Sequence, residues 1–140
     1  KDFLKSMVHQ FKKAGIRTSI FVDPVIEMVE GAAAIGTDRI ELYTEKFAKE
    51  FAMGHKESSI APYVKAAIKA NELGLGINAG HDLDLQNLSY FANNIPQLLE
   101  VSIGHALICD ALYLGLENAV QLYKRCLMGS SGYVYGEVMA

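Results

Sequence analysis

Four strand-like segments alternate with helix-like segments along this chain, and this order constrains the fold more than any other feature. The strand-like runs lie at residues 16–23, 39–44, 75–80 and 99–104. A segment with helical periodicity follows each of them, and another precedes the first. Strands that alternate with helices form a parallel sheet through right-handed crossovers. The sequence therefore predicts an α/β fold with four parallel strands.

The distribution of polar residues within the strands separates two kinds of parallel sheet. Successive strand residues point to opposite faces. One predicted face is apolar and carries Ile40, Leu42, Leu75, Ile77, Ala79, Leu99, Val101 and Ile103, whereas the other carries Glu41, Tyr43, Gly76, Asn78, Gly80, Glu100, Ser102 and Gly104. A flat sheet covered by helices on both sides has two apolar faces. The pattern instead predicts a (β/α)8 TIM barrel with a polar mouth.

The length of the chain fits only part of such a barrel. A complete barrel usually has about 250 residues, and this chain has 140. The chain starts with Lys1 inside a helical pattern, and we expect it to be a piece of a longer protein. We expect residues 1–128 to be a portion of one barrel domain. Residues 129–140 lack helical periodicity and are expected to be a flexible tail or one of engineered origin.

Composition excludes several classes of partner. The formal net charge of −3 gives no support to nucleic-acid or membrane-surface binding. Cys109 and Cys126 form no CxxC pair, which predicts buried thiols in a reducing compartment. No long apolar run or secretory signal is present, so we expect a cytoplasmic protein. No metal-ligand cluster has convincing spacing, and we expect no metal site.

The first candidate for chemistry is His81, which follows the strand-like run 75–80. The C-terminal ends of the strands form the catalytic face of a barrel, and imidazole exchanges protons near neutral pH. A histidine that caps the next helix is the alternative. His81 is therefore a candidate acid or base.

The second candidate is the Gly104-His105 pair, which opens a helix directly after a strand. Free N–H groups at a helix start, reached through a glycine, can bind phosphate. An ordinary strand-to-helix turn is the alternative reading, because a lone Gly-His pair is a weak motif.

Two carboxylates complete the set of candidates. Glu41 is predicted to point into the barrel, where a charge is costly unless it is paired or functional. A structural ion pair, for example with Arg17, is the alternative. Asp23 ends the first strand before Pro24, and we expect it to stabilise the loop or cap the next helix rather than to act in catalysis.

Taken together, four strings resemble a known family. They are GIRTSIFVD at residues 15–23, RIELYT at 39–44, INAGHDL at 77–83 and VSIGHAL at 101–107. In this order they closely resemble the C-terminal part of pyridoxine 5′-phosphate synthase, a family of (β/α)8-barrel enzymes of vitamin B6 biosynthesis. The resemblance covers roughly residues 1–128. Its specificity comes from the combination of NAGH and IGHA, because each string alone is not specific.

The resemblance implies a transferase that condenses 1-deoxy-D-xylulose 5-phosphate with 3-amino-2-oxopropyl phosphate. The products are pyridoxine 5′-phosphate, inorganic phosphate and water, and the family needs no cofactor or metal. By position, His81 is implied as the proton donor and Glu41 as the group that stabilises the transition state. Asp82, Gly104 and His105 are implied to bind the phosphate of the amino ketone. As an intact protein it is expected to form a homo-oligomer.

The chain departs from the family pattern at three positions near these residues. Asp82 stands where many members have glycine, so only a backbone contact to phosphate is expected from it. Tyr43 and Glu45 replace the histidine and glycine that often follow the strand glutamate. The family's first four strands, which carry further catalytic groups, are absent, so we expect this segment alone to be inactive and to aggregate or pair with a second half.

Two other readings remain from the sequence. One is another phosphate-handling barrel, such as an isomerase or an aldolase, although a Schiff-base aldolase needs a strand-end lysine and none of the four strands supplies one. The other is a non-catalytic half-barrel that binds a phosphorylated ligand or assembles as a scaffold.

Overall fold

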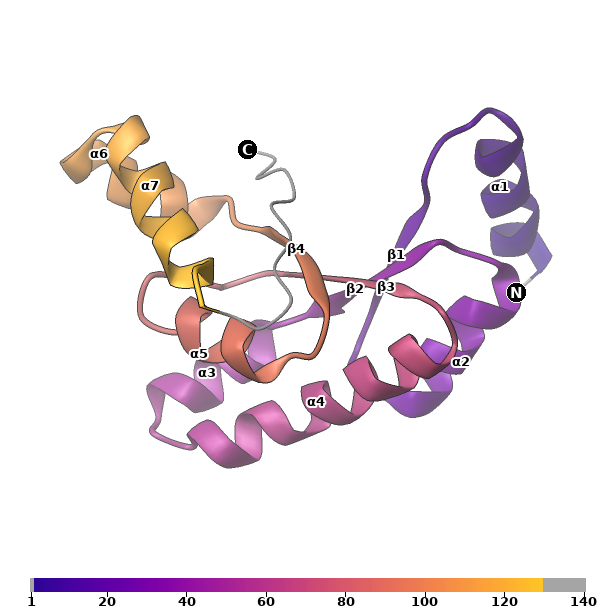
Figure 1. Cartoon of the computed structure of the whole chain (residues 1–140), viewed down its shortest axis with the longest axis horizontal. Coiled ribbons are helices and arrows are strands. Elements are labelled where there is room, and N and C mark those ends of the chain that lie inside the picture. Colours follow the sequence, from indigo (N-terminus) through magenta and orange to yellow (C-terminus); the bar gives the residue numbers. More distant parts are fainter. Residues whose placement is uncertain (1, 130–140) are drawn as a thin grey trace.

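The computed structural model describes residues 2–129, which form one four-stranded parallel sheet with helices (Figure 1). The strands are β1 (Ser19–Val22), β2 (Arg39–Tyr43), β3 (Gly76–Gly80) and β4 (Leu98–Ser102). The helices are α1 (Asp2–Lys13), α2 (Ile26–Ile35), α3 (Glu45–Ala52), α4 (Lys56–Glu72), α5 (Leu88–Asn94), α6 (His105–Leu114) and α7 (Leu116–Leu127). The predicted alternation of strands and helices is confirmed.

The strands lie side by side in chain order, β1-β2-β3-β4, and every neighbouring pair is parallel. Figure 1 shows α2 and α4 along one side of the sheet, and α6 and α7 beyond β4. Within residues 2–129, β1 and β4 each have a strand neighbour on one side only. This open arrangement with two free edges is consistent with half of a TIM barrel, whose complete form pairs every strand on both sides.

The two predicted faces of the sheet are present in its central strands. Ile40, Leu42, Ile77 and Ala79 are fully buried against the helices. Among their neighbours is Tyr63 of α4, which is also fully buried. Since each fully buried aliphatic side chain contributes roughly 1.5–3 kcal/mol, this face holds the helices on the sheet. The opposite face carries the polar residues, among them Glu41 and Asn78, which are paired in register.

The prediction for Leu99 is wrong, because β4 contains an irregularity. Leu98 pairs with Ile77, but Glu100 pairs with Asn78, so the register shifts by one residue between these pairs. A Cβ atom added to Gly76 would lie 2.9 Å from Cδ1 of Leu99. Leu99 therefore lies on the polar face, and Leu98 takes its place in the apolar core.

Two helix boundaries show how side chains and glycine set the ends of elements. α5 begins only at Leu88, because the Asp84 carboxylate accepts hydrogen bonds from the N–H groups of Gln86 (2.9 Å) and Asn87 (3.0 Å). This arrangement is a local turn rather than a helix. The helical segment after β4 is divided into α6 and α7 at Gly115, where φ is +80°.

Three other expectations have different outcomes. Cys109 is exposed, so the prediction that both thiols are buried is wrong, because its position on α6 has no covering element among the described residues. The predicted tail at residues 129–140 lies outside the described residues, apart from Gly129. No helix within residues 2–129 is long and apolar enough to cross a membrane.

A polar clamp ties α1 to the start of β1 and predicts a pH dependence of stability. Lys12 Nζ lies 2.8 Å from Oδ1 of Asp38, and Oδ2 accepts hydrogen bonds from the Thr18 N–H (2.8 Å) and hydroxyl (2.9 Å). The Lys12 contact first, and then the Thr18 N–H, lower the pKa of Asp38 to about 2. A lowered carboxyl pKa stabilises the folded state above the unfolded pKa of about 4, and this contribution is lost as the pH falls toward 2.

We expect the clamp to contribute about 1 kcal/mol to the free energy of unfolding at neutral pH, after allowance for solvent screening. Urea unfolding of Asp38→Asn and the unmodified protein measures the difference at pH 6 and again near pH 2. The difference is expected to shrink at the lower pH. An equal difference at both pH values would contradict the assignment to the Asp38 charge.

Candidate active site

Four of the five predicted site residues line one cleft at the C-terminal ends of the strands. The cleft has a volume of about 650 Å³, and His81, Asp82, Gly104 and His105 contribute to its wall. The remainder comes from α3, from the loop after β3 and from the junction of β4 and α6, and it includes Lys49, Phe51, Asp84, Asn87 and Ser102. The fifth predicted residue, Glu41, is not among the lining residues and lies on the polar face of β2, in register with Asn78 of β3. The parallel topology thus brings Lys49 and His105, which are 56 positions apart in the sequence, into the wall of one cleft.

The chain reverses sharply at His81 and Asp82, where the backbone is left-handed. Their φ angles are +86° and +58°, a region that residues other than glycine rarely adopt. Thr44, which is fully buried at the end of β2, holds this turn. The Thr44 N–H (2.9 Å) and hydroxyl (2.7 Å) both donate hydrogen bonds to the Gly80 carbonyl oxygen. The hydroxyl also contacts the His81 carbonyl oxygen. Such strained backbone is concentrated at functional sites in proteins.

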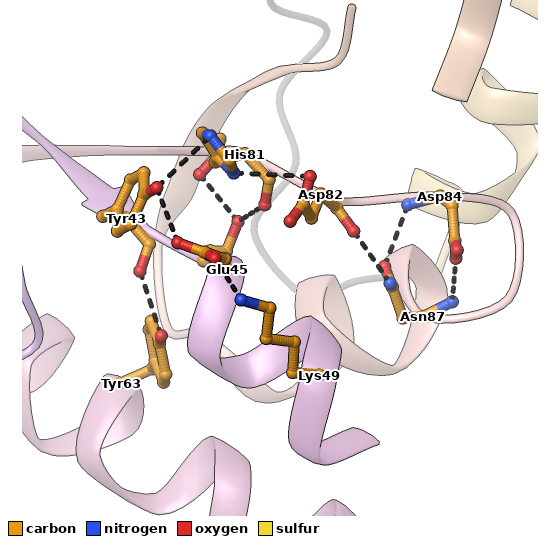
Figure 2. Close-up of polar contacts among 10 residues, drawn as sticks. Tyr43, Glu45, Lys49, Tyr63, His81, Asp82, Asp84 and Asn87 are labelled. Atoms are coloured by element: carbon orange, nitrogen blue, oxygen red, sulfur yellow. Dashed lines mark hydrogen bonds and ion pairs between the residues drawn. The ribbon is translucent and has the colours of Figure 1, made fainter. Parts of the chain in front are cut away.

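The turn presents the His81 imidazole beside Tyr43 (Figure 2). The two ring centroids are 4.5 Å apart with an interplanar angle of 57°. Nε2 of His81 lies 3.3 Å from the Tyr43 hydroxyl, and Nδ1 lies 3.4 Å from Oδ1 of Asp82. The side chain is 46% exposed, so the ring is accessible from the cleft while both nitrogens have polar neighbours.

Sequence reasoning missed a polar chain that continues from Tyr43. Its hydroxyl donates a hydrogen bond to Oε2 of Glu45 (2.7 Å), and Glu45 forms an ion pair with Lys49 one turn along α3. The hydrogen bond to Glu45 raises the pKa of Tyr43, and the contacts with Lys49 and Tyr43 lower the pKa of Glu45. The only signal in the sequence is the position of Tyr43, two residues after Glu41 on the same face.

Glu41 carries a buried oxygen atom without a hydrogen-bond partner. This atom, Oε1, is inaccessible to solvent. A Cβ atom added to Gly80 would lie 2.6 Å from it, so the glycine makes room for the carboxylate. The possible ion pair with Arg17 is not formed, because Arg17 pairs with Glu100 (3.0 Å), as does Arg39. Uncompensated burial of a carboxylate oxygen is costly, which favours a functional reading of Glu41 over a structural one.

Gly104 and His105 stand at the N-terminus of α6. No side chain caps this helix, and the Gly104 carbonyl accepts the Ile108 N–H at 3.1 Å. The first N–H groups of an α-helix have no partner within the helix, and both residues are exposed. A Cβ atom on Gly104 would meet no heavy atom within 4 Å. The helix start therefore offers open N–H groups at the cleft, which is an arrangement suited to an anion.

The Asp23 side chain does not cap α2. The residue before α2 is Val25, not Asp23, and no side chain caps that helix. The expectation of an Asp23 cap is therefore wrong, although its backbone carbonyl accepts the Val25 N–H at 2.7 Å and closes the turn. Within residues 2–129, no group of three or more His, Cys, Asp or Glu side chains is arranged to hold a metal ion.

Comparison with known proteins supplies the family. Residues 1–129 match the model of a family described as pyridoxal phosphate biosynthesis protein PdxJ. The chain belongs to this family. The match includes all five candidate residues.

Curated relatives of the PdxJ family place the chain within longer proteins. It is 64% identical over 127 residues to a pyridoxine 5'-phosphate synthase of Flavobacterium johnsoniae, and this match covers 91% of the chain and 53% of the relative. Proteins of the same name from Cytophaga hutchinsonii and Christiangramia forsetii are 64% and 60% identical, over 89% and 91% of the chain. These matches cover 52% of the Cytophaga hutchinsonii protein and 53% of the Christiangramia forsetii protein. The chain thus spans about half the length of the relatives it matches.

Proposed function

We propose that this chain is the C-terminal half of a pyridoxine 5′-phosphate synthase. The reaction condenses 1-deoxy-D-xylulose 5-phosphate with 3-amino-2-oxopropyl phosphate, closes the ring, and releases phosphate and water. The observation that carries the proposal is the cleft that His81 shares with the N-terminus of α6. It joins an imidazole, which can transfer protons, to a group of backbone N–H donors suited to a phosphate.

In this proposal His81 is the proton donor. Ring closure and dehydration require a hydroxyl group to leave, and a hydroxyl group leaves more readily when a nearby acid protonates it. The left-handed turn at residues 81 and 82 projects the ring from the end of β3 into the cleft. Its 46% exposure leaves space for a substrate oxygen to approach.

Glu41 stabilises positive charge in the transition state. Imine and carbinolamine intermediates of an amino ketone carry such charge, and a fixed carboxylate in a water-poor site stabilises it. The unpartnered buried Oε1 atom supports this role, because the partner is supplied only when the intermediate forms. Glycine at position 80 preserves the space beside this oxygen.

The phosphate of the amino ketone lies at the start of α6. Gly104 and His105 bind it through backbone N–H groups, and the Asp82 backbone, which also lines the cleft, contributes a further contact. The Asp82 carbonyl is already occupied by Nδ2 of Asn87 (3.1 Å), and its carboxylate faces His81. These contacts leave the Asp82 N–H as its group for an anion. No metal or cofactor takes part.

The remaining catalytic groups and the second phosphate site come from the missing half of the barrel. The free edges of β1 and β4 and the exposed Phe21 on the polar face, which is 60% exposed and paired in register with Glu41, support this view. Exposed strand edges favour association with other chains. The isolated chain is therefore inactive, and the intact protein works as a homo-oligomer in the cytoplasm.

The competing readings have less support. A Schiff-base aldolase needs a reactive lysine at a strand end. Lys49 lines the cleft, but it lies on α3 and is paired with Glu45. A non-catalytic half-barrel that binds a phosphorylated ligand does not explain why the His81 imidazole is exposed and positioned in the cleft.

A completed barrel tests the proposal directly. We define it as a chimera in which this chain replaces the matching 127-residue region of the Flavobacterium johnsoniae relative. Formation of pyridoxine 5′-phosphate is expected from the completed barrel and not from the chain alone. Phosphate release gives an independent measurement. A soluble completed barrel that binds the amino ketone phosphate without turnover would favour the binding-module reading, and turnover by the chain alone would contradict its dependence on the other half.

A further inference from the structure

The Tyr43 hydroxyl lies between His81 and Glu45, and it determines the direction of the hydrogen bonds. A hydroxyl group has one proton to donate. Oε2 of Glu45 is 2.7 Å away, and the lowered pKa of Glu45 keeps this carboxylate ionised and therefore an acceptor only. The proton consequently lies toward Glu45. The Tyr43 oxygen is then an acceptor for its other neighbour, Nε2 of His81, at 3.3 Å.

We propose that Tyr43 is a positioning residue that holds His81 with its retained proton on Nε2 and leaves Nδ1 as the nitrogen that exchanges a proton with substrate. This inference rests on the proposed role of His81. In the acid step, the Nδ1–H bond of the imidazolium breaks, its electron pair stays on the ring, and the proton moves to the departing hydroxyl. The neutral Nε2–H tautomer remains, held by Tyr43.

The surroundings of Nδ1 are compatible with this exchange. Oδ1 of Asp82 lies 3.4 Å from it, and this contact, like the 3.3 Å contact at Nε2, is longer than a good N–H···O hydrogen bond. The Asp82 side chain is 48% exposed, so a substrate oxygen can replace it at Nδ1. At Nε2, by contrast, Tyr43 occupies the position that a substrate atom would need.

Tyr43 is itself held at several points, which a positioning residue requires. Its ring packs against the His81 ring, and its backbone carbonyl accepts a hydrogen bond from the hydroxyl of the fully buried Tyr63 (3.0 Å). Glu45 lies in the first turn of α3, where the helix dipole favours a carboxylate. Lys49 holds Glu45 from position i+4 (Figure 2).

The first test uses Tyr43→Phe in the completed barrel, because phenylalanine keeps the ring contact and removes only the hydroxyl. Selective ¹⁵N labelling of histidine reports the tautomer of His81 by NMR. We expect the Nε2–H tautomer in the unmodified protein and a mixture of tautomers in the variant. We also expect kcat to fall about tenfold with KM changed less than about twofold, as when an orienting partner of a functional group is lost.

Tyr90→Phe is the matched control. It also removes one hydroxyl from a partly buried aromatic ring, but that hydroxyl has no hydrogen-bond partner in the described part of the chain, and the ring packs on Phe47 and Phe51 instead. Its kcat and the His81 tautomer should match those of the unmodified protein.

A double-mutant cycle separates this inference from the proposed function. If Tyr43 acts through His81, Tyr43→Phe should lower kcat no further in the His81→Asn background. An Nδ1–H tautomer in the unmodified protein, or an equal effect of Tyr43→Phe in both backgrounds, would overturn the positioning role. If His81→Asn alone keeps full activity, the proton-donor proposal fails, and the NMR tautomer still decides whether Tyr43 orients the ring.

Discussion

Replacement of His81 by asparagine is expected to lower kcat of the completed barrel by about 10²–10⁴-fold, the usual contribution of a positioned general acid. Asparagine is the informative substitution because position 81 has a φ of +86°, and asparagine tolerates this backbone region better than most residues. The turn should therefore persist while the titratable ring is lost. Initial rates of pyridoxine 5′-phosphate formation, with circular dichroism to verify folding, measure the effect.

His55→Asn is the matched control for this experiment. His55 lies between α3 and α4, is exposed, and pairs with Glu50 (2.8 Å) rather than with a residue of the cleft. Its replacement should leave kcat within about twofold, as expected for a surface substitution. A His81→Asn enzyme that is as active as the His55→Asn enzyme would remove the proton-donor assignment.

Replacement of Glu41 by glutamine is expected to lower activity without lowering stability. The substitution removes the negative charge, so kcat should fall about 10²–10³-fold if that charge stabilises a cationic transition state. The folded protein should be no less stable, because an unpartnered buried carboxylate oxygen is replaced by a neutral amide. Steady-state kinetics and urea unfolding of the same preparations give the two values.

Glu100→Gln provides the contrast, since Glu100 lies on the same face of the sheet but is paired with Arg17 and Arg39. Removing one partner of a partly buried ion pair leaves the other charges uncompensated. We therefore expect Glu100→Gln to destabilise the protein more than Glu41→Gln does. A Glu41→Gln protein that loses stability while keeping its turnover would show that Glu41 is structural.

The strands and their faces could be predicted because alternation and helical periodicity are local properties of the sequence. The positions of Ile40 and Leu42 in the core, and of Glu41 on the opposite face, follow from side-chain parity alone. Leu99 could not be placed this way, since the register shift between β3 and β4 arises from pairing with a distant strand. Asp84 similarly redirects the backbone through side-chain hydrogen bonds that periodicity does not contain.

The position of the candidate site could be predicted from the sequence, but the contacts among its side chains could not. The strand-end location of His81 and the helix start at His105 are visible in the sequence, and a shared cleft follows from parallel topology. The contact between His81 and Tyr43 depends on the left-handed turn at residues 81 and 82. No local sequence motif predicts such a turn at a His-Asp pair. The preference of Arg17 for Glu100 over Glu41 likewise depends on the folded arrangement of three strands.

The spatial order of the strands has a consequence for how the protein is made. Because β1, β2, β3 and β4 are neighbours in chain order, each strand pairs with the one synthesised just before it. Partners such as Ser19 and Arg39, or Ile77 and Leu98, are therefore separated by one strand–helix unit only. Short closure distances favour rapid pairing. The sheet can grow by one unit at a time from the ribosome, and a preceding half of the barrel would act as the template on which β1 docks.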